Sequence, residues 1–139
     1  MAYCTKADIV DLLTEETLIG LTDDHGVGRV DDARVAKAIA DADAEIDGYA
    51  GERYSLPFSP VPLIIRKLSV DISIYNLYAR RQGAPDERRQ RYDNSVKLLK
   101  EIAAGRVTLG ATPPAEASSD APDITSQTRI FSRDKLKGF

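Results

Sequence analysis

Three prolines within six residues divide this 139-residue chain into two helical parts. Pro57, Pro60 and Pro62 lie in the stretch GYAGERYSLPFSPVPLIIR, residues 48–66, between two segments with helical periodicity. Proline disfavours helical backbone at the residue before it, and Pro62 suits a first helical position, where its missing N–H would have no partner. We therefore expect a fixed bend, the elbow (residues 54–62), that sets the angle between two helices.

Helical periodicity continues through most of the chain before the elbow. Thr5 and Thr14 can cap two short helices, because a threonine hydroxyl accepts hydrogen bonds from the free N–H groups of a first turn. Asp31 opens a longer helix, which Gly48 and Gly51 are expected to end. The apolar face of this longer helix repeats every three or four positions: Val35, Ile39, Ala42, Ile46 and Tyr49.

The helix expected after the elbow, LIIRKLSVDISIYNLYARR, is apolar on more than one side. Ile64 and Leu68 belong to one apolar stripe, and Val70 and Ile74 belong to another. A helix that is apolar nearly all round is buried by neighbours, either within its own chain or across an interface. A last helix is expected to end at Gly105. These patterns predict an all-α fold, a compact bundle of four to five helices with a flexible C-terminal tail.

The composition changes after Gly110. Residues 111–123 are rich in proline, alanine and serine without an apolar period, so we expect a flexible linker there. Residues 124–139 are short, basic and punctuated by apolar side chains, and we predict that they form a docking tail. The chain then divides into a helical domain, residues 1–110, the linker and the tail. The partner-binding residues predicted in the tail are Arg129, Ile130, Phe131, Arg133, Leu136 and Phe139.

The net charge of −3 hides an asymmetry along the chain. Residues 1–52 contain 4 Lys and Arg against 13 Asp and Glu, whereas residues 53–139 contain 15 against 9. Opposite charges on two parts of a molecule can steer head-to-tail association between copies. The alternative is two solvated faces that differ in charge. We predict a subunit interface with two carboxylates and two arginines: Asp41, Glu45, Arg88 and Arg89.

Few residues of this chain could carry out catalysis. Cys4 and His25 are its only cysteine and histidine, which excludes an internal disulfide and a metal site built on several histidines. The carboxylates around His25 do not have the spacing of a calcium loop. The chain also lacks a run of about 20 apolar residues and a signal-peptide pattern. We expect no enzymatic activity, no cofactor, no metal and no membrane contact.

One carboxylate, Asp71, falls among the apolar residues of the helix after the elbow. A buried carboxylate must find partners or become protonated, and Tyr54, an arginine or the elbow backbone could supply them. Tyr49 and Tyr54 are expected to pack at the elbow with hydroxyls that bond exposed carbonyls. We predict these residues as the structural joint: Tyr49, Tyr54, Pro57, Pro62 and Asp71.

Residues 80–91, RRQGAPDERRQR, contain five arginines and suggest binding to nucleic acid. A DNA reader aims polar side chains from a recognition helix at base edges, whereas these arginines surround a turn between helices. The net charge of the chain is also negative. Binding of DNA through this run, in a small DNA-binding or packaging accessory protein, is kept as the alternative function.

The run AEIDGYAGERYSLPF, residues 44–58, resembles a signature of the Mu-like bacteriophage neck protein family. Pro62, followed by a helix that contains an aspartate and ends in Leu-Tyr-Ala-Arg, is also similar, as are MAYCTKADI and TDDHGVGRVDD nearer the N-terminus. The resemblance covers most of the chain up to the last long helix. The family is similar in organisation to the small helical head-to-tail connectors of tailed phages.

The resemblance implies a structural subunit of a connector ring that joins the portal region of a phage or prophage to its tail. It implies further copies of the chain, the portal and tail-side virion proteins as partners, with DNA passing through the ring without sequence-specific contact. The expected location is the host cytoplasm during assembly and the virion neck in the mature particle.

Overall fold

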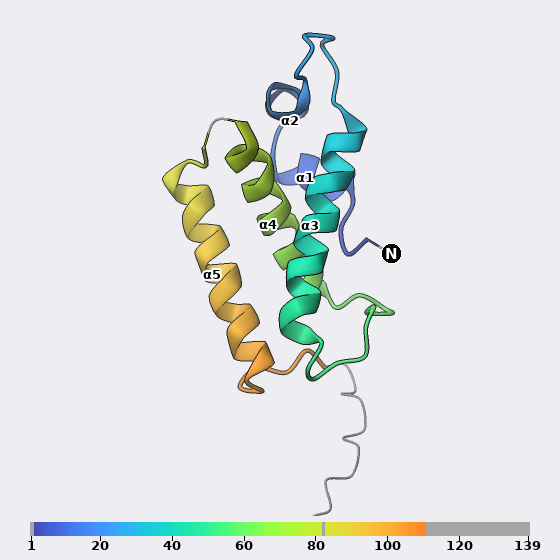
Figure 1. The fold of residues 1–139 in the computed structure, drawn as a ribbon, viewed down its shortest axis with the longest axis vertical. Helices are drawn as coiled ribbons and strands as arrows, with labels where there is room; N and C mark the ends of the chain where they lie inside the picture. Colours follow the sequence, from blue (N-terminus) through green and yellow to red (C-terminus); the bar gives the residue numbers. More distant parts are fainter. Residues whose placement is uncertain (1, 82, 111–139) are drawn as a thin grey trace, which may run out of the picture.

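Five α-helices make up the part of the chain that the computed structural model describes, residues 2–81 and 83–110 (Figure 1). The prediction of an all-α fold built as a compact bundle is confirmed, and no strand occurs among these residues. The predicted linker and docking tail, residues 111–139, lie outside the described part. In chain order the helices are α1 (Lys6–Leu12), α2 (Glu15–Thr22), α3 (Asp32–Ala50), α4 (Leu63–Arg81) and α5 (Asp86–Ala103).

The first three helices begin at the side-chain caps that the sequence predicts. The Thr5 hydroxyl accepts a hydrogen bond from the Asp8 N–H, and the Asp8 carboxylate accepts one from the Thr5 N–H at 2.8 Å. Thr14 and Asp31 likewise accept hydrogen bonds from N–H groups in the first turns of α2 and α3. These bonds satisfy donors that have no partner inside a helix, and they fix where each helix starts.

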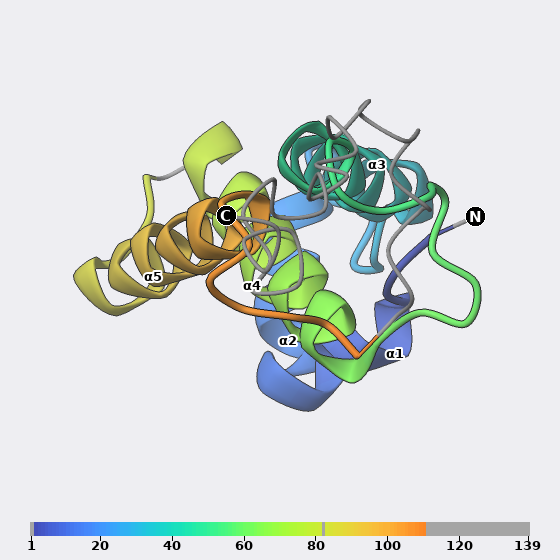
Figure 2. The same cartoon turned by 90° about the horizontal axis from the view of Figure 1, so that it is seen from below.

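α4 lies at the centre of the bundle and contacts all four other helices. Figure 2 shows α3 and α5 on one side of α4, with α1 and α2 on the other. Leu68 and Ile72 pack in a buried cluster with residues of the elbow. Val70 and Ile74 pack in a second cluster with residues of α1, α2 and α3. The buried residues of α4 are therefore covered by its own chain, which is one of the two alternatives that the sequence left open.

The end of α3 differs from the prediction, whereas the bounds of α4 match the expected stretch and Pro62 lies just before it. Gly48 does not end α3, which continues to Ala50 and is capped by Gly51 at an ordinary helical φ of −63°. A single glycine lowers helix propensity by only about 1 kcal/mol, which the buried face of a long helix readily outweighs. α4 begins at Leu63, one residue after Pro62, and the Pro62 carbonyl accepts its first hydrogen bond at 3.1 Å.

α5 ends where Gly105 predicts. Gly105 has a φ of 78°, a left-handed backbone conformation that residues other than glycine rarely adopt. Its N–H bonds to the Ile102 carbonyl at 3.1 Å, and the Arg106 N–H bonds to the Glu101 carbonyl at 3.0 Å. This pair of bonds is a Schellman motif, which satisfies the last carbonyls of the helix. The chain then turns back under the bundle toward the elbow (Figure 2).

Candidate interaction surfaces

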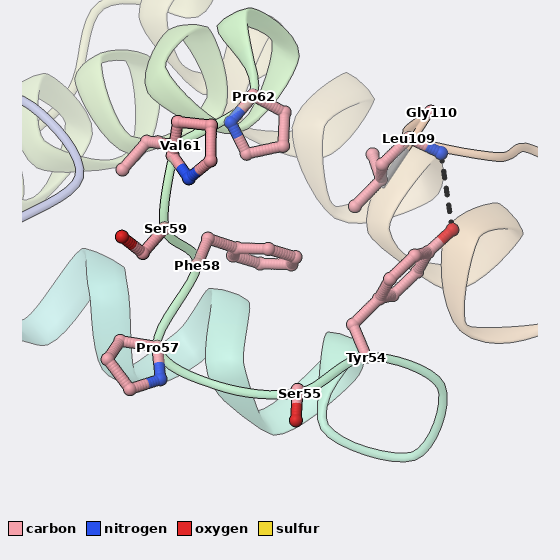
Figure 3. Close-up of a pocket in the computed structure, with 10 residues that line it drawn as sticks. Tyr54, Ser55, Pro57, Phe58, Ser59, Val61, Pro62, Leu109 and Gly110 are labelled. Carbon is pink, nitrogen blue, oxygen red and sulfur yellow. Dashed lines mark hydrogen bonds between the residues drawn. The ribbon is translucent and has the colours of Figure 1, made fainter. Parts of the chain in front are cut away.

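Three aromatic rings fix the elbow against the rest of the bundle. The Phe58 ring centroid lies 5.6 Å from that of Tyr3 and 5.8 Å from that of Tyr54, and all three side chains are buried. The Tyr54 hydroxyl accepts a hydrogen bond from the Leu109 N–H at 3.2 Å (Figure 3). We expected this hydroxyl to bond a carbonyl; it bonds an N–H instead. Tyr54 therefore connects the elbow to the segment that follows α5.

A groove of about 560 Å³ opens beside the elbow, with Pro57 and Pro62 among its lining residues (Figure 3). The peptide bonds that precede Pro57 and Pro60 are cis. Leu109 and Gly110, the last residues that the structure describes, complete the lining. The lining residues include no carboxylate, histidine, lysine or cysteine. The groove therefore offers a surface for packing and no charged group for chemistry.

Asp43 and Asp47 of α3 hold the N-terminal segment in place. The Asp43 carboxylate accepts hydrogen bonds from the Tyr3 N–H at 2.9 Å and from the Ser69 hydroxyl of α4 at 2.6 Å. The Tyr3 hydroxyl bonds to Asp47. Burial raises the pKa of Asp43, and it also raises the pKa of the Cys4 thiol, which lies 3.2 Å from Ser69. The sequence analysis missed this network; Ser69, a polar residue on a buried stretch of α4, is its only signal.

Asp71 is buried at the junction of α4 and α5, with 2% of its side chain exposed. Lys67 donates to its Oδ2 at 2.8 Å, and Arg91 of α5 lies 3.9 Å from its Oδ1. That Oδ1 has no hydrogen-bond donor among the described residues. An arginine was one of the partners expected for Asp71. Tyr54, another expected partner, bonds to Leu109 instead.

Asp24 holds the loop between α2 and α3 (residues 23–31, the acidic loop) against the end of α4. Its carboxylate accepts hydrogen bonds from the Arg80 guanidinium at 2.8 and 2.9 Å. Arg34 and Arg81 lie 3.3 and 3.4 Å from the same carboxylate. The hydrogen bond from Arg80 lowers the pKa of Asp24. Two arginines of the run considered for nucleic-acid binding are thus engaged within the chain.

The two carboxylates predicted for a subunit interface have partners within the chain. Asp41 is exposed and pairs with Lys37, one turn earlier in α3, at 2.6 Å. Glu45 accepts a hydrogen bond from the Tyr92 hydroxyl of α5 at 2.9 Å. Burial, together with this bond to Glu45, raises the pKa of Tyr92 to about 12. Glu45 therefore contributes to the contact between α3 and α5.

The two predicted interface arginines differ from each other in their surroundings. Arg88 is half-buried, and its guanidinium reaches the Leu12 carbonyl at the end of α1, at 3.5 Å. Arg89 is exposed and forms no ion pair with any described residue. Among the four predicted interface residues, Asp41 and Arg89 are exposed, whereas Arg88 is half-buried. Tyr49, predicted as part of the joint, is half-buried and lines a groove between α3 and α5.

The described residues contain no group of three or more His, Cys, Asp and Glu side chains placed to hold a metal ion. None of the described helices is both long and apolar enough to cross a membrane. The predicted docking residues lie outside the described part of the chain.

Comparison with known proteins places the chain among phage proteins. The family described as Bacteriophage Mu, Gp36 matches residues 3–126. Gene product J of Escherichia phage Mu is 30% identical over 143 residues, an alignment that covers 100% of this chain and 99% of that protein. Mu-like prophage FluMu protein gp36 of Haemophilus influenzae is 33% identical over 112 residues, covering 79% of this chain and 78% of its own.

Proposed function

Because the chain belongs to the Bacteriophage Mu, Gp36 family, we propose that it is a structural subunit of the head-to-tail connector of a Mu-like phage or prophage. Copies of the chain would form a ring between the portal and the tail-side proteins, with no enzymatic step. DNA would pass through this ring without sequence-specific contact. The protein would be assembled in the host cytoplasm and reside in the virion neck.

The observation that carries this proposal is that the buried and paired polar side chains of the body join its elements to one another. Asp24 ties the acidic loop to α4, Asp43 ties the N-terminal segment to α3 and α4, and Tyr54 ties the elbow to the segment after α5. Each of these groups joins one element to another. A body held together at these connections suits a subunit that must keep the same shape around a ring.

The place where the described part of the chain ends supports a separate docking role for its last residues. Leu109 and Gly110 line the groove beside the elbow, and Figure 1 shows the acidic loop at the opposite end of the body. Residues 124–139 carry Phe131 and Phe139 among basic side chains. Contiguous apolar surface that a protein leaves exposed often marks a contact with a partner. We propose that this segment binds the protein layer beyond the elbow end of the subunit.

Deleting residues 124–139 tests the docking role. The melting temperature of the helical domain should stay nearly unchanged, while heads and tails from the altered phage should fail to join. Phe131→Ala should weaken joining measurably, because a buried aromatic anchor often dominates a small interface. Ser132→Ala, one residue away, is the matched control and should join normally. The readouts are infectious titre and the fraction of joined particles in electron micrographs. Normal titre after the deletion would contradict the docking role.

A further inference from the structure

Two surface patches of the described body carry apolar centres that no described element covers. The first, the leucine patch, is a shallow hollow of about 220 Å³ between α1 and the start of α4. It contains Leu12 and Leu63, which are 47% and 81% exposed. Only one other large apolar side chain of the described part, Val27, is exposed to this degree. Leu12 and Leu63 therefore form an apolar site whose two side chains project from the body.

The second patch, the tyrosine groove, is a hollow of about 300 Å³ between α3 and α5. Tyr49 of α3 and Tyr92 of α5 are half-buried in its lining. Tyr92 is fixed from both sides, because its ring stacks on Tyr75 of α4 at 4.1 Å and its hydroxyl donates to Glu45 at 2.9 Å. The groove therefore presents a preformed aromatic surface that could receive a projecting apolar side chain.

Each of the two patches is lined by two carboxylates and two cationic side chains. The leucine patch has two carboxylates on α1, Asp8 and Asp11, and two cations on α4, Arg66 and Lys67. The tyrosine groove has two carboxylates and two lysines around its aromatic centre: Glu45, Asp93, Lys97 and Lys100. Two such patches can meet with each carboxylate pair facing a cationic pair. Complementary charge of this kind fixes orientation and suppresses wrong pairings.

The two patches lie between different pairs of helices. α1 lies on one side of α4, while the groove lies between α3 and α5 on the other (Figure 2). One molecule therefore cannot bring its own patches together, but one copy can present the leucine patch to the tyrosine groove of the next. A contact between two different faces repeats from copy to copy and closes into a ring when the rotation allows it.

We propose that the leucine patch of one copy binds the tyrosine groove of the next copy. Leu12 and Leu63 pack against Tyr49 and Tyr92, and the two lysines of the groove face Asp8 and Asp11. The role of this contact in a connector ring rests on the proposed function. The contact itself can be tested separately, because it predicts that the purified protein self-associates. The pairing expected from the sequence, Asp41 and Glu45 with Arg88 and Arg89, stays a separate prediction.

Sedimentation velocity of the full-length chain tests the contact through apolar substitutions. Leu63→Ser should weaken self-association at least about tenfold, because the variant removes a projecting anchor. Val27→Ser is the matched control, since Val27 is 60% exposed but lies in the acidic loop, outside both patches. It should associate as the parent does. Circular dichroism should show both variants folded, because neither position is in the core.

Charge reversal provides the second arm of the same experiment. Asp11→Lys alone and the double variant Lys97→Glu/Lys100→Glu should each weaken association at about 50 mM salt, and less at about 500 mM salt, where charges are screened. Combining the three changes should restore part of the association. The proposal is overturned if Leu63→Ser behaves like Val27→Ser, if the combined variant is no better than the singles, or if the parent stays monomeric at the highest concentration reached. Absence of this protein from the neck of assembled particles would instead contradict the proposed function.

Discussion

The acidic loop contains two glycines and three aspartates, and the elbow contains three prolines. Both are irregular connections between helices, yet they are held in different ways. Asp23 of the loop accepts hydrogen bonds from the N–H groups of Val27 and Gly28 at 2.9 and 2.8 Å, while the loop remains exposed. Phe58 of the elbow is 3% exposed and packs between two tyrosines. Charge and hydrogen bonds hold the loop, whereas burial holds the elbow. The two connections should therefore respond differently to salt, to pH and to loss of a side chain.

The largest effect should come from removing the central ring of the elbow. Phe58→Ala should lower the free energy of unfolding by about 3–5 kcal/mol, because it removes buried apolar surface and leaves a cavity. The loss should be the same at low and high salt, since no charge is involved. Denaturant unfolding measures it, with Ser59→Ala, an exposed neighbour, as the control. A loss under about 1 kcal/mol would mean that burial of this ring does not fix the elbow.

A smaller effect should follow from removing only the hydroxyl that joins the elbow to the segment after α5. Tyr54→Phe keeps the buried ring and deletes the acceptor of the Leu109 N–H, so it should cost about 0.5–1.5 kcal/mol. Amide hydrogen exchange at Leu109 should become faster, while exchange in the centre of α4 should change only as much as global stability does. Unchanged exchange at Leu109 would show that this bond does not hold the segment.

The smallest effect at neutral pH should come from the acidic loop. Asp24→Asn removes an exposed ion-pair network, so its loss of stability should shrink in high salt, unlike the loss from Phe58→Ala. Arg80 lowers the pKa of Asp24 below its usual value of 3.8. The folded state therefore binds its proton less readily than the unfolded state, and stability from Asp24 is lost as pH falls below that value.

The difference in unfolding free energy between the parent and Asp24→Asn should accordingly be present at about pH 7 and decrease as the pH falls below 3.8, toward the lowered pKa of the folded state. Asp43 titrates with the opposite sign, because burial raises its pKa, but it is common to both proteins and cancels in the difference. Thermal or denaturant unfolding across this range measures the closing difference. A difference in unfolding free energy that stays constant with pH and salt would mean that burial, and not charge, holds the loop, as it holds the elbow.

The helices could be predicted because their signals are local. Thr5, Thr14 and Asp31 mark starts through bonds within one turn, and Gly105 marks an end through its own backbone conformation. The elbow could be predicted for the same reason, since proline restricts its neighbours whatever the tertiary structure. Burial of α4 on both sides also follows from its composition, although the choice between its own chain and an interface needed the structure.

The partners of the charged residues could not be predicted, because they lie far apart in the sequence. Tyr3 and Asp43 are 40 positions apart, and Asp24 and Arg80 are 56 apart. Glu45 has the sequence surroundings of a solvated carboxylate, and only the packing of α5 on α3 places the Tyr92 hydroxyl beside it. A charge pattern along the chain therefore shows which residue types could form an interface, but not which of them already have partners within the chain.

Electron cryomicroscopy of the mature phage particle tests the proposed connector role most directly. The account predicts a ring of density between the head vertex and the tail, into which the five-helix body fits repeatedly around the axis, with α1 of each copy next to the groove between α3 and α5 of its neighbour. A neck whose density is fully explained by other proteins, in particles that lack this chain, would contradict the account.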